Sequence, residues 1–321
     1  MLRTARRRWT REMDGEIDGI ALGDTGPLLL HGYTPPAGGK WKDDVIPGRL
    51  GAYDRQSGKE LWVSPCEVGY GRGFGAGLGD EDDVVVLGPG SGGHLIARMS
   101  LSSGELLGAE SIEPFDQAVV GGDLCMTLTP GRVTGLLTGP MLEVWSFRRE
   151  GERYHLLGRD GAHVFVLYTD NKAKRQGVLR VEVESGEFVS ELLPPELAVV
   201  HDMAVGGGVA VLLVGEGLKR AAAQERLFLL GVSTTEDGTV LWRDPIPEEG
   251  LGGMPDVSIR LDDGKLYVAR DSLLDVRDVL TGRQLGEVTV PGLDEHIAWH
   301  VSQGAGLLAE ETRVSVFEIP D

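Results

Sequence analysis

The sequence predicts an all-β fold, a seven-bladed β-propeller of four-stranded blades whose ring is closed by the N-terminal strand. Three observations predict this fold. A hairpin with a glycine in its turn recurs along the chain at a period typical of propellers, roughly 40–50 residues. Two further apolar strands separate each hairpin from the next. The last repeat stops one strand short, and the N-terminal segment offers a strand that would complete it.

The recurring hairpin is clearest in "GRLGAYDRQSGKELWV", which runs from Gly48 to Val63. Apolar residues alternate with polar or small ones, which is the two-residue period of a half-buried strand. Gly58 lies in the polar turn, where glycine accepts a positive φ at no steric cost. Five later segments align on this glycine, with successive glycines 46, 35, 47, 52 and 44 residues apart: Gly104, Gly139, Gly186, Gly238 and Gly282.

Between the hairpins lie seven segments built as an apolar strand, a Gly- or Asp-containing turn and a second apolar strand. Examples are "HDMAVGGGVAVLLVG" and "VSIRLDDGKLYVA". One such pair and one hairpin make four strands, so the seven pairs predict seven four-stranded blades.

The final repeat supplies a third strand at "TRVSVFEIPD", where the sequence ends. Trp9 precedes the first apolar pair at an offset similar to that of Trp62. We therefore expect the N-terminal strand to pair with residues 312–319, which would leave no open sheet edge there. The alternative is a disordered basic tail, because "ARRRWTREM" is rich in arginine.

Two tryptophans follow turn glycines at the same offset, Trp62 in "GKELW" and Trp242 in "GTVLW". We expect both side chains to pack against a neighbouring blade, because a large aromatic surface fills the wedge between two sheets.

The run Ala52-x-Asp54-x-x-Ser57-Gly58-x-x-x-Trp62 resembles the tryptophan-docking motif of the pyrroloquinoline-quinone-like β-propeller repeat. That repeat occurs in quinoprotein dehydrogenases and in an outer-membrane assembly lipoprotein of the same fold. The resemblance implies the propeller fold and says little about activity. A quinone cofactor is not expected, because those dehydrogenases carry adjacent cysteines and usually eight blades, and neither is predicted here.

Composition narrows the class of protein. The 321 residues carry a formal net charge of −19, which argues against general nucleic-acid binding. No apolar run is long enough for a membrane span, and arginines interrupt any apolar signal core at the start. Cys66 and Cys125 fall in different predicted blades, so we expect no disulfide and a cytoplasmic location. We expect residues 1–321 to form a single domain and the protein to be a monomer.

The longest predicted connections fall on one face of the propeller. They join the second strand of a blade to the third, or one blade to the next, and include residues 34–48, 169–177 and 215–226. Five of the seven lysines lie in these three loops. Loops on a rigid scaffold often carry function, so we expect a protein partner to bind this face. The expected contact residues are Lys40, Lys42, Lys172, Lys174, Arg175, Lys219 and Arg220. The alternative is that lysine simply populates solvated loops.

Histidines and carboxylates recur where the innermost strands begin, at the predicted mouth of the central channel. Such side chains converging on one axis could act as acid and base or bind a divalent metal. The catalytic candidates are His155, His201, Asp202 and His296, and weaker metal candidates are Asp116, His201, Asp256 and His296. The alternative is a water-filled polar lining, because no local metal-binding spacing such as H-E-x-x-H is present.

The sequence therefore favours a non-catalytic propeller scaffold that presents a loop-rich face to a protein partner. The alternative is a lyase or hydrolase with a metal-assisted site at the channel mouth. Whether the protein is an enzyme stays open at this point. No cofactor is expected, apart from the divalent metal that the alternative would need.

Overall fold

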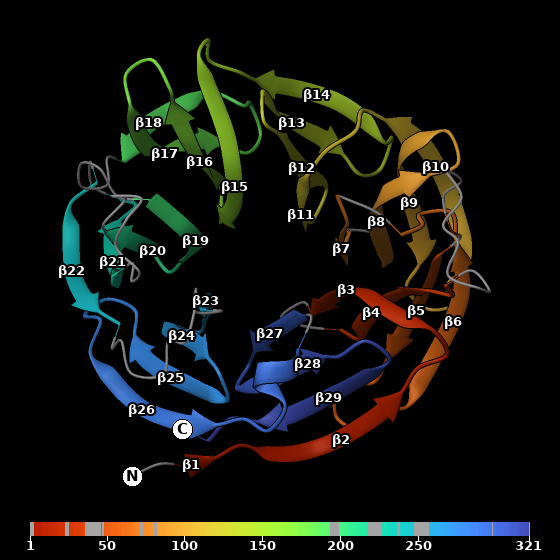
Figure 1. The fold of residues 1–321 in the computed structure, drawn as a ribbon. Coiled ribbons are helices and arrows are strands. Elements are labelled where there is room, and N and C mark those ends of the chain that lie inside the picture. The colour runs from red at the N-terminus through yellow and green to blue at the C-terminus, as the bar shows by residue number, and fades with distance from the viewer. Residues whose placement is uncertain are drawn as a thin grey trace. The chain divides into compact units, whose positions relative to one another are not determined.

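The computed structural model describes residues 3–22, 26–35, 46, 48–70, 73–79, 82–192, 199–216, 226–235, 238–246, 257–296 and 298–320. Their strands form seven sheets (Figure 1). Six sheets contain four consecutive antiparallel strands, and one of these six gains a fifth, parallel strand; the seventh combines the last three strands with a strand from the N-terminus. We call these sheets blades 1 to 7 in chain order. The predicted all-β propeller of four-stranded blades is confirmed.

The chain clusters into two compact units, which we describe separately. The first unit comprises Met1–Ala5, Arg148–Asp294 and Pro320, and the second comprises Arg6–Phe147, Glu295–Ile319 and Asp321. That residues 1–321 act as a single domain stays a prediction.

The second unit holds blades 1, 2, 3 and 7. Blade 1 consists of β3 (Glu16–Leu22), β4 (Leu28–Tyr33), β5 (Gly48–Tyr53) and β6 (Glu60–Cys66). Blade 2 consists of β7 (Gly75–Leu78), β8 (Asp83–Gly90), β9 (Gly93–Ser100) and β10 (Leu106–Ile112). Blade 3 consists of β11 (Gln117–Gly121), β12 (Leu124–Thr129), β13 (Arg132–Leu137) and β14 (Leu142–Phe147). Blade 7 consists of β27 (Ala298–Ser302), β28 (Ala305–Ala309), β29 (Arg313–Glu318) and the N-terminal β2 (Arg6–Glu12).

The first unit holds blades 4, 5 and 6. Blade 4 consists of β15 (Glu152–Asp160), β16 (His163–Asp170), β17 (Arg175–Glu182) and β18 (Phe188–Leu192). Blade 5 consists of β19 (Val199–Gly206), β20 (Val209–Glu216), β21 (Arg226–Ser233) and β22 (Val240–Pro245). Blade 6 consists of β23 (Val257–Asp262), β24 (Lys265–Arg270), β25 (Leu273–Asp278) and β26 (Gln284–Thr289). A 3-10 turn, η1 (Leu293–Glu295), follows β26.

The hydrophobic core lies between the faces of neighbouring blades. The middle strands are covered on both faces, so they are almost continuous apolar runs, as in Val84–Leu87 of β8, which are fully buried. One core cluster joins blade 1 to blade 2 through residues such as Leu50 and Val86. Another joins blade 4 to blade 5 through residues such as Phe165 and Leu212.

The N-terminal segment completes blade 7, as predicted. β2 pairs antiparallel with β29, and Trp9 lies opposite Val316. The structure adds a strand that the sequence did not predict. β1 (Arg3–Thr4) pairs in parallel with the outer edge of β26, and Ala5 N donates a 2.9 Å hydrogen bond to Thr289 O.

Tryptophan docking between blades is confirmed. Trp62 Nε1 donates to Leu101 O of blade 2 at 2.7 Å, and its ring covers Gly104, where a Cβ would lie 2.4 Å from Trp62 Cε3. Trp242 Nε1 donates to Val279 O of blade 6 at 2.8 Å, and its ring covers Gly282 in the same way.

The predicted turn residue of blade 3 is wrong by two positions. The residue with positive φ in this turn is Met141, at 54°, and not Gly139. Trp145 therefore stands four residues after the left-handed residue, as Trp62 does after Gly58. The alignment failed because here a side chain other than glycine adopts the left-handed conformation.

Candidate functional site

The longest connections between strands lie at one end of the blades. The first-to-second and third-to-fourth turns are short, the longest of them spanning residues 54–59 and 234–239. The opposite end carries the segments between β4 and β5 (34–47), between β20 and β21 (217–225) and between β22 and β23 (246–256). The strand bounds therefore agree with the prediction that the longest connections lie at one end of the blades.

One predicted loop is shorter than expected. Residues 169–177 do not form a long loop, because β16 continues to Asp170 and β17 begins at Arg175. Only Asn171–Lys174 connects the two strands, and Asp170 Oδ1 stabilises this turn by accepting from Lys172 N at 2.9 Å and Ala173 N at 3.0 Å. These hydrogen bonds hold the pKa of Asp170 below its usual value.

Three of the seven predicted contact residues are described, and they lie together on blade 4. Lys172 and Lys174 are exposed in the turn, and Arg175 starts β17. Arg149, which precedes β15, joins them at the same end of the blade. We call these four cations the blade 4 basic surface. The other four predicted residues lie outside the described residues: Lys40, Lys42, Lys219 and Arg220.

The two arginines of this surface are held in place by carboxylates and an aromatic ring. Arg149 Nε lies 3.3 Å from Glu152 Oε1, and Arg149 Nη1 lies 3.6 Å from Glu191 Oε2. Arg175 Nη1 lies 3.8 Å from Glu191 Oε1. Both guanidinium groups stand over the Tyr168 ring, at 5.9 Å and 6.0 Å from its centroid. The Tyr168 hydroxyl in turn donates a hydrogen bond to Glu191 Oε1.

Burial disfavours the charged form of Glu152, the carboxylate that lies against Arg149. Glu152 is a buried side chain whose Oε2 has no hydrogen-bond partner among the described residues. Burial raises the pKa of Glu152, and the charge of Arg149 opposes this shift only in part. The carboxyl group therefore holds its proton more readily than an exposed glutamate does.

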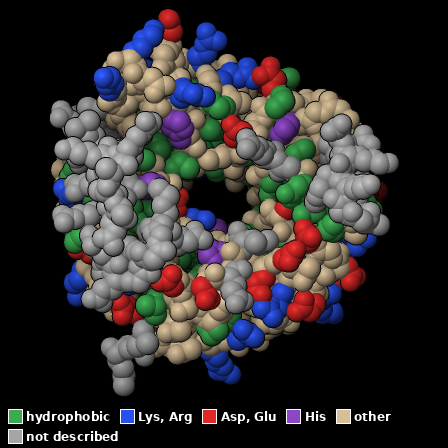
Figure 2. Space-filling view, in the orientation of Figure 1, with side chains coloured by type: hydrophobic (Ala, Val, Ile, Leu, Met, Phe, Trp, Pro, Cys, Tyr) green, Lys and Arg blue, Asp and Glu red, His purple; other side chains and the backbone are tan. Residues whose placement is uncertain are grey.

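The two lysines differ from the arginines, because neither forms an ion pair with any described residue. On β18, Phe188 is 48% exposed, and the Arg149 guanidinium lies 5.4 Å from the centroid of its ring. Figure 2 shows Lys and Arg side chains gathered over blade 4, at the top of the view, whereas Asp and Glu side chains gather over blade 1. The blade 4 basic surface thus combines fixed arginines with free lysines, and an exposed aromatic ring lies against Arg149.

The predicted catalytic histidines of the first unit share a backbone feature. His155 and His201 are each the extra residue of a β-bulge in the first strand of a blade, and both are exposed. Their strands, β15 and β19, are in contact. His155 Nε2 lies 2.6 Å from Thr169 Oγ1. Burial and the charge of Arg153 both lower the pKa of the His155 imidazole.

Asp202 ties two blades together. Its Oδ2 accepts from Ile259 N of blade 6 at 3.0 Å and lies 3.5 Å from Arg260 Nη1, while Oδ1 accepts from Met203 N at 2.8 Å. With three such contacts, this carboxylate has a structural role in the first unit.

The structure does not bring the predicted metal residues into one described site. Asp116 and His296 belong to the second unit, His201 belongs to the first, and Asp256 lies outside the described residues. Within the described part of the chain, no three His, Cys, Asp or Glu side chains gather as metal ligands would.

A third bulge in a first strand holds a buried ion pair that the sequence did not reveal. Asp18 is the extra residue in β3, and its Oδ1 lies 2.5 Å from Nδ1 of the buried His31. His31 Nε2 lies 2.9 Å from Val68 O, which can only accept, so this nitrogen carries a proton. Burial lowers the pKa of His31, but hydrogen bonds to Asp18, Cys66 and Val68 O and the charge of Asp18 outweigh it, raising the pKa to about 10.

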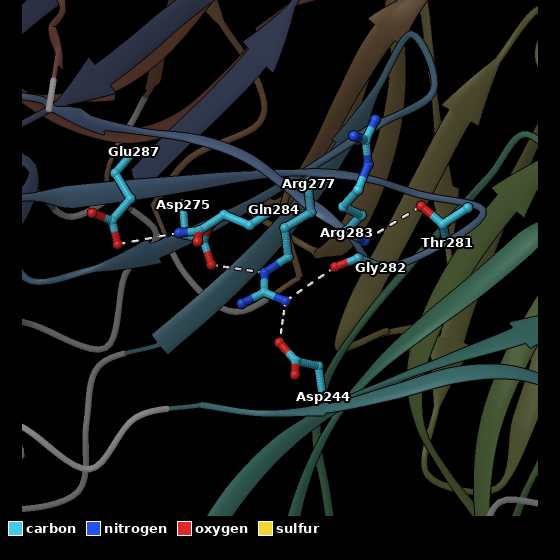
Figure 3. Close-up of polar contacts among 8 residues, drawn as sticks. All are labelled: Asp244, Asp275, Arg277, Thr281, Gly282, Arg283, Gln284 and Glu287. Atoms are coloured by element: carbon cyan, nitrogen blue, oxygen red, sulfur yellow. Dashed lines mark hydrogen bonds and ion pairs between the residues drawn. The ribbon is translucent and has the colours of Figure 1, made fainter. Parts of the chain in front are cut away.

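A second buried cation lies between blades 5 and 6 (Figure 3). Arg277 of β25 forms ion pairs with Asp244 of β22 and, at 2.7 Å, with Asp275, and it donates to Gly282 O at 3.1 Å. The guanidinium is thus fixed beside the turn on which Trp242 docks. This network links two blades, which makes it a structural feature.

Comparison with known proteins supports the fold. No protein-family model matches the chain, and no curated protein sequence matches it. The solved structure of BamB from Moraxella catarrhalis is similar, with 13% identity, a TM-score of 0.52, and 98% of this chain and 100% of that chain covered. The computationally designed protein Ika8 is also similar, with 12% identity, a TM-score of 0.58 and the same coverage. At these identities the likeness concerns the fold alone, a β-propeller.

The described residues contain no helix with the length and apolar character that a membrane span requires.

Proposed function

We propose that this protein is a non-catalytic β-propeller scaffold that binds an acidic segment of a protein partner on the blade 4 basic surface. The single observation that carries the proposal is this cluster of four cations in a chain of net charge −19, located at the end of blade 4 where its second strand turns into its third. The fold shared with BamB is compatible with this role.

The surface has the composition of a binding site. Arginine and aromatic residues are enriched at the centres of protein interfaces, where they fill pockets and lose their water. Arg149 and Arg175 are already fixed over aromatic rings, so binding would cost little of their conformational freedom. Lys172 and Lys174 extend beside them and would attract a negatively charged partner over some distance.

Comparative capture from native lysate tests the proposal. The bait would be the intact protein, the variant Lys172→Glu/Lys174→Glu and a control, Lys59→Glu/Arg283→Glu. The control residues are exposed in third-to-fourth-strand turns at the opposite end of the blades. We expect a protein with an acidic segment to be retained by the intact chain and the control and lost from the blade 4 variant. Equal retention by all three would refute the proposed site.

The alternative function is a lyase or hydrolase whose acid–base groups include His155 and His201. The observation that favours it is that both histidines are exposed at β-bulges on neighbouring strands, because bulges are frequent beside active sites. Its test is the divalent-metal content of the purified protein, compared between the intact chain and His155→Ala/His201→Ala. A metal retained by the first and lost from the second would favour the enzyme.

A further inference from the structure

A cavity of about 350 Å³ opens between blades 7 and 1, at the end where the first-to-second and third-to-fourth turns of these two blades lie. It is lined by residues of the second unit from both blades. By contrast, the cavity beside Arg277 between blades 5 and 6 has a volume of only about 20 Å³. The cavity between blades 7 and 1 has the size of small-molecule sites, which usually begin near 300 Å³.

The polar part of this cavity is basic. Arg8 of β2 and Arg55 of the blade 1 turn both line it, together with Gln56 and Gln303. None of the described lining residues is acidic, although the chain as a whole carries a charge of −19. Arg55 is positioned by a hydrogen bond from Nη2 to Ser302 O at 3.3 Å.

Arg8 is weakly engaged in the protein itself. Its Nη2 lies 4.0 Å from Glu318 Oε1, and the two side chains are 35% and 51% exposed. Exposed ion pairs at such a distance contribute little to stability, so an anionic ligand could displace Glu318 at small cost.

The floor of the cavity is apolar. Leu28, Ala305, Leu307 and Val316 line it, and all four are buried members of the core cluster between blades 7 and 1. Gly26 and Gly306 also line the cavity. A ligand that filled this space would bury an aliphatic group against preformed apolar walls.

We propose that this cavity binds a small aliphatic carboxylate, with its carboxylate group at Arg8 and Arg55 and its hydrocarbon chain over Leu28, Leu307 and Val316. The basic rim selects for negative charge, because a guanidinium matches the two oxygens of a carboxylate. The apolar floor selects for an alkyl chain and against small, fully hydrated anions.

The test uses isothermal titration calorimetry on the full chain, with octanoate as the probe. We expect saturable binding of one octanoate, with affinity falling about fourfold for each methylene removed in heptanoate and hexanoate. Octylamine, which reverses the charge of the head group, should not bind. Absence of saturable binding, no dependence on chain length, or equal binding of octylamine would overturn the proposal.

Variants separate the two parts of the site. Arg8→Gln should weaken octanoate binding about tenfold, because it removes a charge-assisted hydrogen bond. Arg6→Gln is the matched control, since Arg6 is exposed on the same strand and does not line the cavity. Ala305→Leu should fill the floor and abolish binding. If Ala305→Leu fails to fold, the comparison of Arg8→Gln with Arg6→Gln tests the site. Equal effects of these two substitutions on octanoate affinity would contradict the proposed carboxylate site.

Discussion

Trp62 is joined to Leu101 of the next blade by a 2.7 Å hydrogen bond from its indole nitrogen to the backbone oxygen. The ring also covers Gly104, which belongs to the same turn as Leu101. One side chain thus fixes both the spacing and the register of two sheets that share no backbone ladder.

Replacing Trp62 by alanine should reduce the free energy of unfolding by about 3–5 kcal/mol, as for other large buried aromatic residues. The matched control is Leu61→Ala, because Leu61 is adjacent and 54% exposed and should change stability by less than about 0.5 kcal/mol. Urea denaturation followed by circular dichroism measures both. A loss below about 1 kcal/mol for Trp62→Ala would show that this side chain contributes little to the packing of blade 1 against blade 2.

Gly104→Ala should destabilise the protein more than Gly264→Ala. Both glycines have a φ of +71°, so both substitutions strain the backbone equally. A Cβ at position 104 would meet Trp62 at 2.4 Å, whereas nothing lies within 4 Å of a Cβ at position 264. We expect the difference to exceed about 1 kcal/mol, because the indole must move out of its site. Equal losses in thermal unfolding would show that the Trp62 ring does not rest on this turn.

The His31–Asp18 pair should make stability depend on alkaline pH. The pKa of His31 is raised from 6.5 to about 10, so its stabilising effect is complete below pH 6.5 and is lost as pH rises through 10. The reference is Asp18→Asn/His31→Gln, which cannot titrate. Relative to it, the intact protein should lose at least about 1.4 kcal/mol between pH 6 and pH 10.5, since one pKa unit corresponds to about that free energy. A constant difference across this range would show that His31 is not protonated in the fold.

Deletion of residues 1–12 should abolish a cooperative thermal transition or cause aggregation. It removes β2 and leaves β29 as an exposed edge strand. Deletion of residues 1–4 removes only β1 and should preserve the transition, because β1 pairs with β26 through just two residues. Calorimetry of both truncations provides the comparison. A longer truncation that melts like the full chain would mean that β2 is not needed for blade 7.

The sequence predicted those parts of the fold that depend on local patterns. Strand alternation and turn glycines are encoded within a few residues, so the blades, the closing strand and the docking of Trp62 were predictable. Met141 was missed because its left-handed φ has no glycine to mark it.

The candidate site was less predictable, because it depends on contacts between distant segments. Arg149 joins the basic surface through the Tyr168 ring and through Glu191, which lies forty-two residues later in the chain, and no local pattern links these residues. The pair of Asp18 and His31 depends on a bulge in β3, and the parallel pairing of β1 depends on the free edge of β26. Such features become visible only when the strands are assembled.

The most direct test of the proposed function is the rate at which the captured partner associates with the protein at low and at physiological salt. Exposed charges act mainly on the encounter of two proteins, and salt screens them. We predict that Lys172→Glu/Lys174→Glu slows association by about tenfold or more at low salt and flattens its salt dependence, with the unfolding free energy unchanged. An association rate and a salt dependence equal to those of the intact protein would contradict the account, because the blade 4 basic surface would then play no part in binding.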